Sequence, residues 1–396
     1  MSEWQTFCLK DLGKIVGGTT PSTNNPKNYG NKIAWITPKD LSTLQGRYIK
    51  KGSRSISRLG FKSCSCVLLP KHAILFSSRA PIGYVAIAKK RLCTNQGFKS
   101  IIPNKKIYFE FLYYLLKYHK DSISNIGGGT TFKEVSGATL GLFKVKIPPT
   151  YYEQQKIART LSILDQKIEN NHKINELLHK ILELLYEQYF VRFDFLDENN
   201  KPYQTSGGKM KFSKELNRLI PSGWSVRFLN HKIVSTYQPK TISKTLLNDS
   251  YSYSVYGGGG IIGRFTEYNH EQSEFIISCR GQCGISYLTL PKSWITGNAM
   301  VIRPTKSYTS KTYLYHTIKK YKLTNYITGS VQPQITRQNL STMPILIPKR
   351  KTLNKWNNIS SLLWNLIHNN MQSTQTLTAL RDFLLPLLLK QQVKPQ

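Results

Sequence analysis

Two long segments of the chain carry apolar residues at alternating spacings of three and four. In the segment from Glu153 to Phe190 these positions are Ile157, Leu161, Leu164, Ile168, Leu178, Leu182 and Leu185. In the second segment they are Trp356, Ile359, Leu363, Leu366, Leu377, Leu380, Leu384 and Leu387. Such spacing draws one narrow apolar stripe along a helix, as in a coiled coil. We therefore predict two long helices, the first of them about 57 Å long.

Polar residues interrupt both stripes near their centres. These are Asn171 and Asn175 in the first segment, and Asn370 and Ser373 in the second. A lone helix with a narrow stripe is marginally stable, so each stripe needs a partner. We predict that the two helices pair antiparallel and that their polar centres fix the register. The alternative is that each helix packs only on its own domain. Pro386 is expected to kink or end the second helix.

Each long helix follows a segment of short apolar runs bounded by Gly, Pro and Ser. Examples are Ile74–Phe76, Tyr84–Ile87 and Phe275–Ile277. This pattern is typical of short strands, and a helix is expected near Tyr108–Tyr118 and near Thr312–Tyr321. Each segment is therefore predicted to form a mainly β lobe.

The two segments are copies of one repeat. Trp4 with Lys14-Ile15-Val16 corresponds to Trp224 with Lys232-Ile233-Val234, and residues 129–148 match 329–348. Residues 73–87 align with 274–288 without a gap, which superimposes Arg79 on Arg280 and Gly83 on Gly284. We predict an α+β protein with two β-rich lobes in tandem repeat, each followed by a long helix.

The predicted boundaries follow from this repeat. The lobes span residues 1–150 and 221–348, and the helical segments span 151–192 and 349–392. Residues 193–220 contain Asn-Asn-Lys-Pro and Ser-Gly-Gly, which are typical of an irregular linker.

The charge of the chain points to a polyanionic partner. Among its 396 residues are 56 Lys and Arg against 21 Asp and Glu, a formal net charge of +35. The basic residues are spread over the whole chain among 23 Tyr and 16 Phe. This distribution favours folded nucleic-acid-binding domains over a membrane-surface anchor.

The cysteines and the termini indicate the compartment. The six cysteines form no CxxC pair and have no histidine partners at metal-site spacing, so we expect reduced thiols and no metal. The first residues are polar and charged, and the longest apolar run, Leu384–Leu389, is too short to span a membrane. We expect a soluble, cytoplasmic protein.

Two sequence motifs imitate known catalytic sites. Gly258, Gly260 and Gly263 fit the dinucleotide-binding fingerprint, but a strand-like run follows them where a helix is required. Ile147-Pro148-Pro149-Thr150 lacks the amide and the aromatic ring that an adenine methyltransferase uses to hold a flipped base. The sequence has no Walker loop, HExxH, GxSxG or paired Cys/His metal set, so we predict that the chain is not an enzyme.

Several stretches resemble the specificity subunits of type I restriction-modification systems. They are KIPPTYYEQQKIARTLSILDQKI, LLYEQYFVRFDF, IPSGWSV, YSVYGGGGIIGRF and GSVQPQITRQNL, and the resemblance covers nearly the whole chain. The second helix departs from the family pattern, because IPKRKTLNKW lacks the Glu-Gln pair present at Glu153-Gln154.

The resemblance implies a role within a larger complex. Each lobe would read one half of a bipartite target in double-stranded DNA, and the paired helices would space the lobes and dock two modification (methyltransferase) subunits. Those subunits would bind S-adenosylmethionine, so no cofactor is expected on this chain. Restriction (motor-nuclease) subunits would join the same complex.

Candidate DNA-binding residues lie in the matching loops. Arg79 and Arg280 could bind guanine or phosphate, although an arginine bonded within its own lobe is an equally good interpretation of a repeated position. The side chains of Gln332, Gln334, Arg337 and Gln338 suit base edges, and Lys133 suits a phosphate. The expected helix-pairing residues are Ile157, Leu161, Leu164, Ile168, Asn171, Leu178, Leu363, Asn370 and Leu377.

Two other classes of function remain open on the sequence alone. One is a stand-alone nucleic-acid-binding protein with a coiled-coil hinge, which would need no partner subunits. The other is a nuclease or methyltransferase in its own right, which the missing motifs disfavour.

Overall fold

The computed structural model describes residues 3–129, 133–249, 251–330 and 332–394. The chain forms two compact units, the first made of Met1–Lys173 with Asn370–Gln396 and the second of Ile174–Asn369. Each unit contains one lobe and one half of each long helix, so its limits fall inside the helices. The units are described one at a time.

The lobe of the first unit is built on a five-stranded sheet in the order β2-β9-β6-β7-β4. Its strands are β2 (Gly13–Gly17), β9 (Lys99–Pro103), β6 (Ile74–Phe76), β7 (Val85–Ala88) and β4 (Tyr48–Ile49). A three-stranded sheet consists of β5 (Arg54–Ile56), β3 (Tyr29–Ile36) and β8 (Cys93–Thr94), and β1 (Gln5–Cys8) pairs with β10 (Lys144–Ile147). The helices are α1 (Leu9–Leu12), η1 (Pro26–Asn28), α2 (Pro38–Ser42), α3 (Arg58–Lys62), α4 (Phe109–Asn125) and α5 (Gly137–Leu142).

The lobe of the second unit repeats this plan. Its four-stranded sheet contains β14 (Val234–Tyr237), β20 (Ala299–Pro304), β17 (Phe275–Ser278) and β18 (Ser286–Leu288). A second sheet holds β16 (Gly260–Phe265), β15 (Tyr253–Gly257) and β19 (Trp294–Ile295), and two pairs join β13 (Ser225–Phe228) to β23 (Pro344–Ile347) and β21 (Ile327–Thr328) to β22 (Gln334–Ile335). The helices are η3 (Lys244–Leu246), α7 (Lys311–Lys320), η4 (Leu323–Tyr326) and α8 (Arg337–Ser341).

The aligned sequence segments occupy equivalent strands in the two lobes. β6 and β7 correspond to β17 and β18, and the turn between them contains Gly83 in one copy and Gly284 in the other. Both glycines have positive φ, 102° and 88°, which disfavours any residue with a Cβ. The predicted helices near Tyr108 and Thr312 are α4 and α7. The predicted tandem α+β repeat is therefore confirmed.

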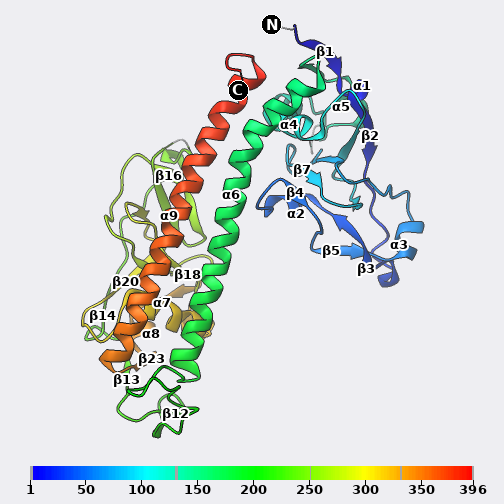
Figure 1. The fold of residues 1–396 in the computed structure, drawn as a ribbon. Coiled ribbons are helices and arrows are strands. Elements are labelled where there is room, and N and C mark those ends of the chain that lie inside the picture. The colour runs from blue at the N-terminus through cyan, green and yellow to red at the C-terminus, as the bar shows by residue number, and fades with distance from the viewer. Residues whose placement is uncertain (1–2, 130–132, 250, 331, 395–396) are drawn as a thin grey trace. The chain divides into compact units, whose positions relative to one another are not determined.

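Helices α6 (Tyr151–Tyr186) and α9 (Arg350–Leu389) pair antiparallel and lie side by side in Figure 1. A single π-helical turn, Glu187–Val191, continues α6. In the first unit, the Asn171 side-chain amide lies 3.2 Å from the Thr374 hydroxyl and 3.4 Å from the Asn370 carbonyl. In the second, the Asn175 amide donates to the Ile367 carbonyl at 3.2 Å. The polar centres thus contact each other across the pair.

The buried stripes agree better with the prediction on α6 than on α9. On α6, Ile157, Leu161 and Ile168 are buried, and Leu164 and Leu178 are half-buried. On α9, Leu363, Asn370 and Leu377 are half-buried. The expected Trp356 is buried, whereas Ile359, Leu366 and Leu380 are exposed by 37%, 44% and 43%. The buried positions of α9 also include Ser360, Trp364, Ile367 and Leu385. The α9 stripe is displaced because its large rings and Ser360 pack on α7.

Two local features refine the expectations. Of the two outcomes expected at Pro386, the end of the helix does not occur there, because α9 continues through Pro386 to Leu389. Proline removes one amide donor from the helix, and only three helical residues follow it. The linker is not wholly irregular, because β11 (Met210–Ser213) and β12 (Arg218–Pro221) form an antiparallel hairpin within it. Asn217 in the connecting turn adopts φ 48°, a conformation that asparagine tolerates.

Candidate nucleic-acid interface

In both lobes, one backbone hydrogen bond joins the loop before α5 or α8 to the turn after β6 or β17. In the first lobe, the Val135 amide donates to the Ser78 carbonyl at 3.0 Å. In the second, the Ile335 amide donates to the Cys279 carbonyl, also at 3.0 Å. Arg79 and Arg280 directly follow these carbonyls. The repeated framework thus brings each arginine next to the loop that carries the other candidate residues of its lobe.

The two arginines have different neighbours in these loops. The Arg79 guanidinium lies 3.5 Å from the Glu134 carboxylate, which also accepts from Lys99 at 3.3 Å. Gln334 occupies the position of Glu134 in the second lobe and forms a backbone bridge with Arg280. Among the described residues Arg280 has no acidic partner, and it is exposed. Arg79 is therefore partly neutralised, whereas Arg280 keeps its full charge.

The candidate residues of the second lobe share one exposed surface. Gln332 and Gln334 lie on the β21–β22 hairpin, and Arg337 and Gln338 begin α8, whose N-terminus is capped by Thr336. All four side chains are exposed. The hairpin needs Gly329, because a Cβ there would lie 2.5 Å from the Gln332 carbonyl oxygen. This surface can offer amide and guanidinium groups to base edges.

Lys133 is exposed in the equivalent loop of the first lobe, beside Glu134. Residues 130–132 and 331 of the aligned segments lie outside the described part of the chain. Sequence reasoning overlooked Glu134. The ungapped match of 129–148 with 329–348 could have revealed it, because Glu134 aligns with Gln334 and a carboxylate in one loop thus corresponds to an amide in the other.

The motifs that imitate catalytic sites have structural roles. Gly258 and Gly260 lie at the tip of the β15–β16 hairpin, and strand β16 follows where a nucleotide-binding site needs a helix. Cys64, Cys66 and Cys93 gather around Thr19, whose hydroxyl lies 3.0 Å from the Cys66 sulfur. Within the residues that the structure describes, no cluster of His, Cys, Asp or Glu is suited to a metal ion. No described helix is long and apolar enough to cross a membrane.

The duplicated lobes of this basic chain, with exposed amide and guanidinium groups, define the class of nucleic-acid-binding proteins. A family model described as the type I restriction modification DNA specificity domain matches residues 1–180 and again 221–380. The chain therefore belongs to the family of type I restriction-modification specificity subunits. Such a subunit determines the DNA target and is itself non-catalytic. It assembles on DNA with restriction subunits and with methyltransferase subunits, which bind S-adenosylmethionine.

Similar proteins support this assignment along the whole chain. The type I restriction enzyme MjaIX specificity subunit of Methanocaldococcus jannaschii is 33% identical over 423 residues, covering 98% of this chain and 92% of that protein. The type I restriction enzyme HindI specificity subunit of Haemophilus influenzae is 31% identical over 191 residues, 46% of this chain and 40% of that protein. The S subunit crystal structure from M. genitalium shares the fold, with a TM-score of 0.60 at 18% identity, covering 97% and 96% of the two chains.

Proposed function

We propose that residues 1–150 and 221–348 each read one half of a bipartite DNA target, and that residues 151–192 and 349–392 set the gap between the halves. The observation that carries this proposal is the backbone hydrogen bond that Val135 makes in the first lobe and Ile335 makes in the second. This bond holds the two loops in the same way, although their exposed side chains differ. Two lobes with different reading surfaces suit a target whose halves differ. We further propose that the complex works in the cytoplasm, where DNA and S-adenosylmethionine are both available.

The reading residues divide into two classes in this proposal. Gln332, Gln334, Arg337 and Gln338 contact base edges, with Arg280 beside them. Lys133 holds a backbone phosphate, since a lysine offers a point charge, whereas Arg79 is paired with Glu134 and binds phosphate only where that pairing is released. Base contacts confer sequence choice, whereas phosphate contacts confer affinity for any sequence.

Methylation mapping of two variants tests this division. Gln334→Ala should relax the choice of bases in one half of the methylated motif and leave the other half unchanged. Lys133→Ala should reduce methylation at all sites alike and leave the motif intact. A Gln334 variant with an unchanged motif, or altered choice in both halves, would contradict the assignment.

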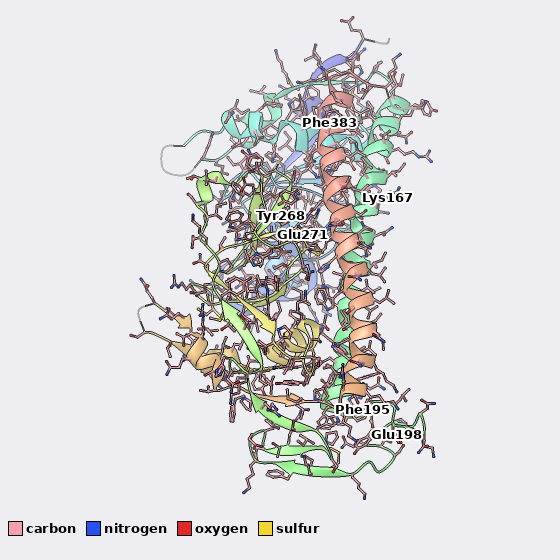
Figure 2. The ribbon with its side chains drawn as sticks, turned by 90° about the vertical axis from the view of Figure 1, so that its left-hand side faces the viewer. Lys167, Phe195, Glu198, Tyr268, Glu271 and Phe383 are labelled. Atoms are coloured by element: carbon pink, nitrogen blue, oxygen red, sulfur yellow. The ribbon has the colours of Figure 1, made fainter. Side chains whose placement is uncertain are left out.

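We also propose that methyltransferase subunits dock on the outer face of the helix pair. In the second unit, the exposed apolar residues on α6 are Ile174, Leu177, Ile181 and Leu184, and those on α9 are Ile359, Leu362 and Leu366. Each of these residues lies one position before a residue that faces the partner helix or the lobe, so together they occupy a neighbouring face. In the first unit, Ile163, Leu380 and Phe383 are exposed likewise, and Figure 2 labels Phe383 on α9. Contiguous exposed apolar surface of this kind marks a protein interface.

Pull-down of the purified methyltransferase subunit tests the docking face. The double variant Leu177→Ser, Leu184→Ser should bind it at least tenfold more weakly, because both leucines are more than half exposed and contribute little to folding. Leu219→Ser, on the β11–β12 hairpin and 53% exposed, is the matched control and should bind normally. Equal binding by the double variant would refute this location.

A further inference from the structure

Trp4 and Trp224 are equivalent residues whose surroundings differ. Each tryptophan directly precedes a strand with the same register in both units. Gln5 pairs with Ile147 and Ser225 pairs with Ile347, and a long helix starts a few residues after each isoleucine. The neighbourhood of one ring can therefore be compared directly with that of the other.

Trp224 is covered by the segment that follows α6. The Phe195 ring stacks on it with centroids 5.1 Å apart and an interplanar angle of 17°. The Phe193 ring meets it edge-on at 5.6 Å, and Tyr203 stacks on the far side of Phe195 at 4.9 Å. Only 1% of Trp224 remains exposed. The aromatic residues of the linker thus complete the site around this tryptophan.

The covering segment is acidic and lies among lysines. Its residues Asp194, Asp197 and Glu198 flank Phe195, and Figure 2 labels Phe195 and Glu198. Lys349, Lys351 and Lys355 line the same place, and the Lys355 ammonium lies 3.4 Å from the Leu196 carbonyl. The Asp194 carboxylate accepts from Thr205, and the Asp197 carboxylate accepts from the backbone amides of Asn199 and Lys201, so both acids bond within their own loop. This position therefore accepts an aromatic ring beside a surface that the lysines make positive.

In the first unit the equivalent position is an open groove. Trp4 is only partly buried, and its one ring contact within the described residues is with Phe111, at 6.1 Å. A groove of about 490 Å³ lies beside it, and its lining includes the apolar Trp4, Ile157, Leu388 and Val393 and the charged Lys156 and Glu153. Tyr152 is 65% exposed, and the Lys156 ammonium lies 5.2 Å from the centre of its ring. Lys394 adds a second positive charge.

We infer that this groove binds an extended segment of the methyltransferase subunit in which an aromatic residue is flanked by acidic residues. The segment would stack on Trp4 as Phe195 stacks on Trp224, and its carboxylates would face Lys156 and Lys394. The segment after α9 brings Val393 and Lys394 to the groove, whereas the segment after α6 brings Phe193 and Phe195 to Trp224. The inference rests on the proposed docking of methyltransferase subunits, and it adds a second contact with its own chemistry.

Photo-crosslinking in the assembled complex tests the identity of the occupant. Tyr152 is replaced by p-benzoylphenylalanine in the full chain, the methyltransferase subunit is added, and the product is mapped by mass spectrometry. We expect a crosslink to a methyltransferase peptide that carries an aromatic residue next to Asp or Glu. Crosslinks to a second copy of this chain or to DNA, or none at all, would overturn the inference.

Charge reversal separates this contact from the helix face. Lys156→Glu should weaken binding of the methyltransferase subunit about tenfold, and the effect should shrink at high salt. Lys167→Glu, an exposed position on the same helix labelled in Figure 2, is the matched control and should bind normally. If Lys156→Glu binds normally while Leu177→Ser, Leu184→Ser binds weakly, the groove inference is wrong and the proposed docking face stands.

Discussion

The two lobes attach to the long helices through different chemistry. In the first unit, Arg47 is 3% exposed, and its guanidinium lies 3.0 Å from Glu110 of α4 and 3.3 Å from Glu169 of α6. Asp165 of α6, itself buried, accepts from Arg381 of α9 at 2.8 Å. In the second unit, the buried part of the corresponding contact is made by rings, and the ion pairs of Lys319 with Glu183 and of Lys320 with Glu187 lie at its more exposed edge. Trp356 and Trp364 of α9 lie 5.3 Å from His316 and Tyr315 of α7, respectively.

This difference shows which features the repeat preserves. Strand register, the glycine turns and the loop attachment recur in both copies, whereas the side chains between lobe and helix do not. A buried ion network contributes little net stability but tolerates few geometries, and removal of one member leaves charges unpaired. An aromatic contact gains stability from buried area and from ring packing. The same backbone arrangement is thus stabilised in two ways, which respond differently to mutation and to pH.

The largest effect is expected from removal of Arg47. Arg47→Met would leave Glu110 and Glu169 without their shared cation, whereas Asp165 would keep Arg381, at a loss of about 3–5 kcal/mol of unfolding free energy from the first unit. Amide hydrogen exchange should become faster in α4 and stay unchanged in α7. Protection lost equally in both helices would show that the network does not act locally.

The next effect, divided between two histidines, is expected when the second unit is acidified. Burial lowers the pKa of His316 to about 3 and that of His368 to about 4, below the ordinary value near 6.5. The unfolded state then takes up protons that the folded state excludes, so stability is complete above pH 6.5 and is lost as the pH falls toward the folded pKa. For each histidine, the unfolding free energy should fall by about 2 kcal/mol between pH 8 and pH 5.

Hydrogen exchange of α7 at these two pH values measures this loss. The double variant His316→Phe, His368→Leu keeps apolar volume at both sites and should flatten the pH dependence. An unchanged pH dependence in that variant would assign the effect to other groups.

The smallest effect concerns the reading loops. Glu134→Gln should release Arg79 to bind phosphate, raise DNA affinity a few-fold at low salt, and steepen the slope of log K against log salt by about 0.9. Gln334→Glu should do the reverse in the second lobe by pairing with Arg280. Filter binding of the assembled complex over a range of salt concentrations measures both. Changes in the same direction for the two variants would contradict the comparison of the loops.

Sequence reasoning predicted those parts of the molecule that depend on local patterns. The alternating spacing of three and four residues located α6 and α9, and the ungapped match of residues 73–87 with 274–288 located equivalent turns. It could not predict the Arg47 network, because Arg47 is 63 residues from Glu110 and 122 from Glu169 and only the fold brings them together. The α9 stripe was displaced because Trp364 and Ser360 face a lobe as well as a helix. The open groove at Trp4 could not be predicted either, because Trp4 aligns with Trp224 and only the fold shows that Phe193 and Phe195 cover Trp224.

The central claim is that two independent reading lobes are held apart by a helical ruler. Its most direct test inserts one heptad into each helix, after Asn170 and after Asn369, which keeps both stripes in phase. The helix pair should lengthen by about 10 Å, or about three base pairs of DNA. Methylome sequencing should then return the same two half-sequences separated by a gap about three base pairs longer. An active variant with the original gap, or with altered half-sequences, would contradict the account.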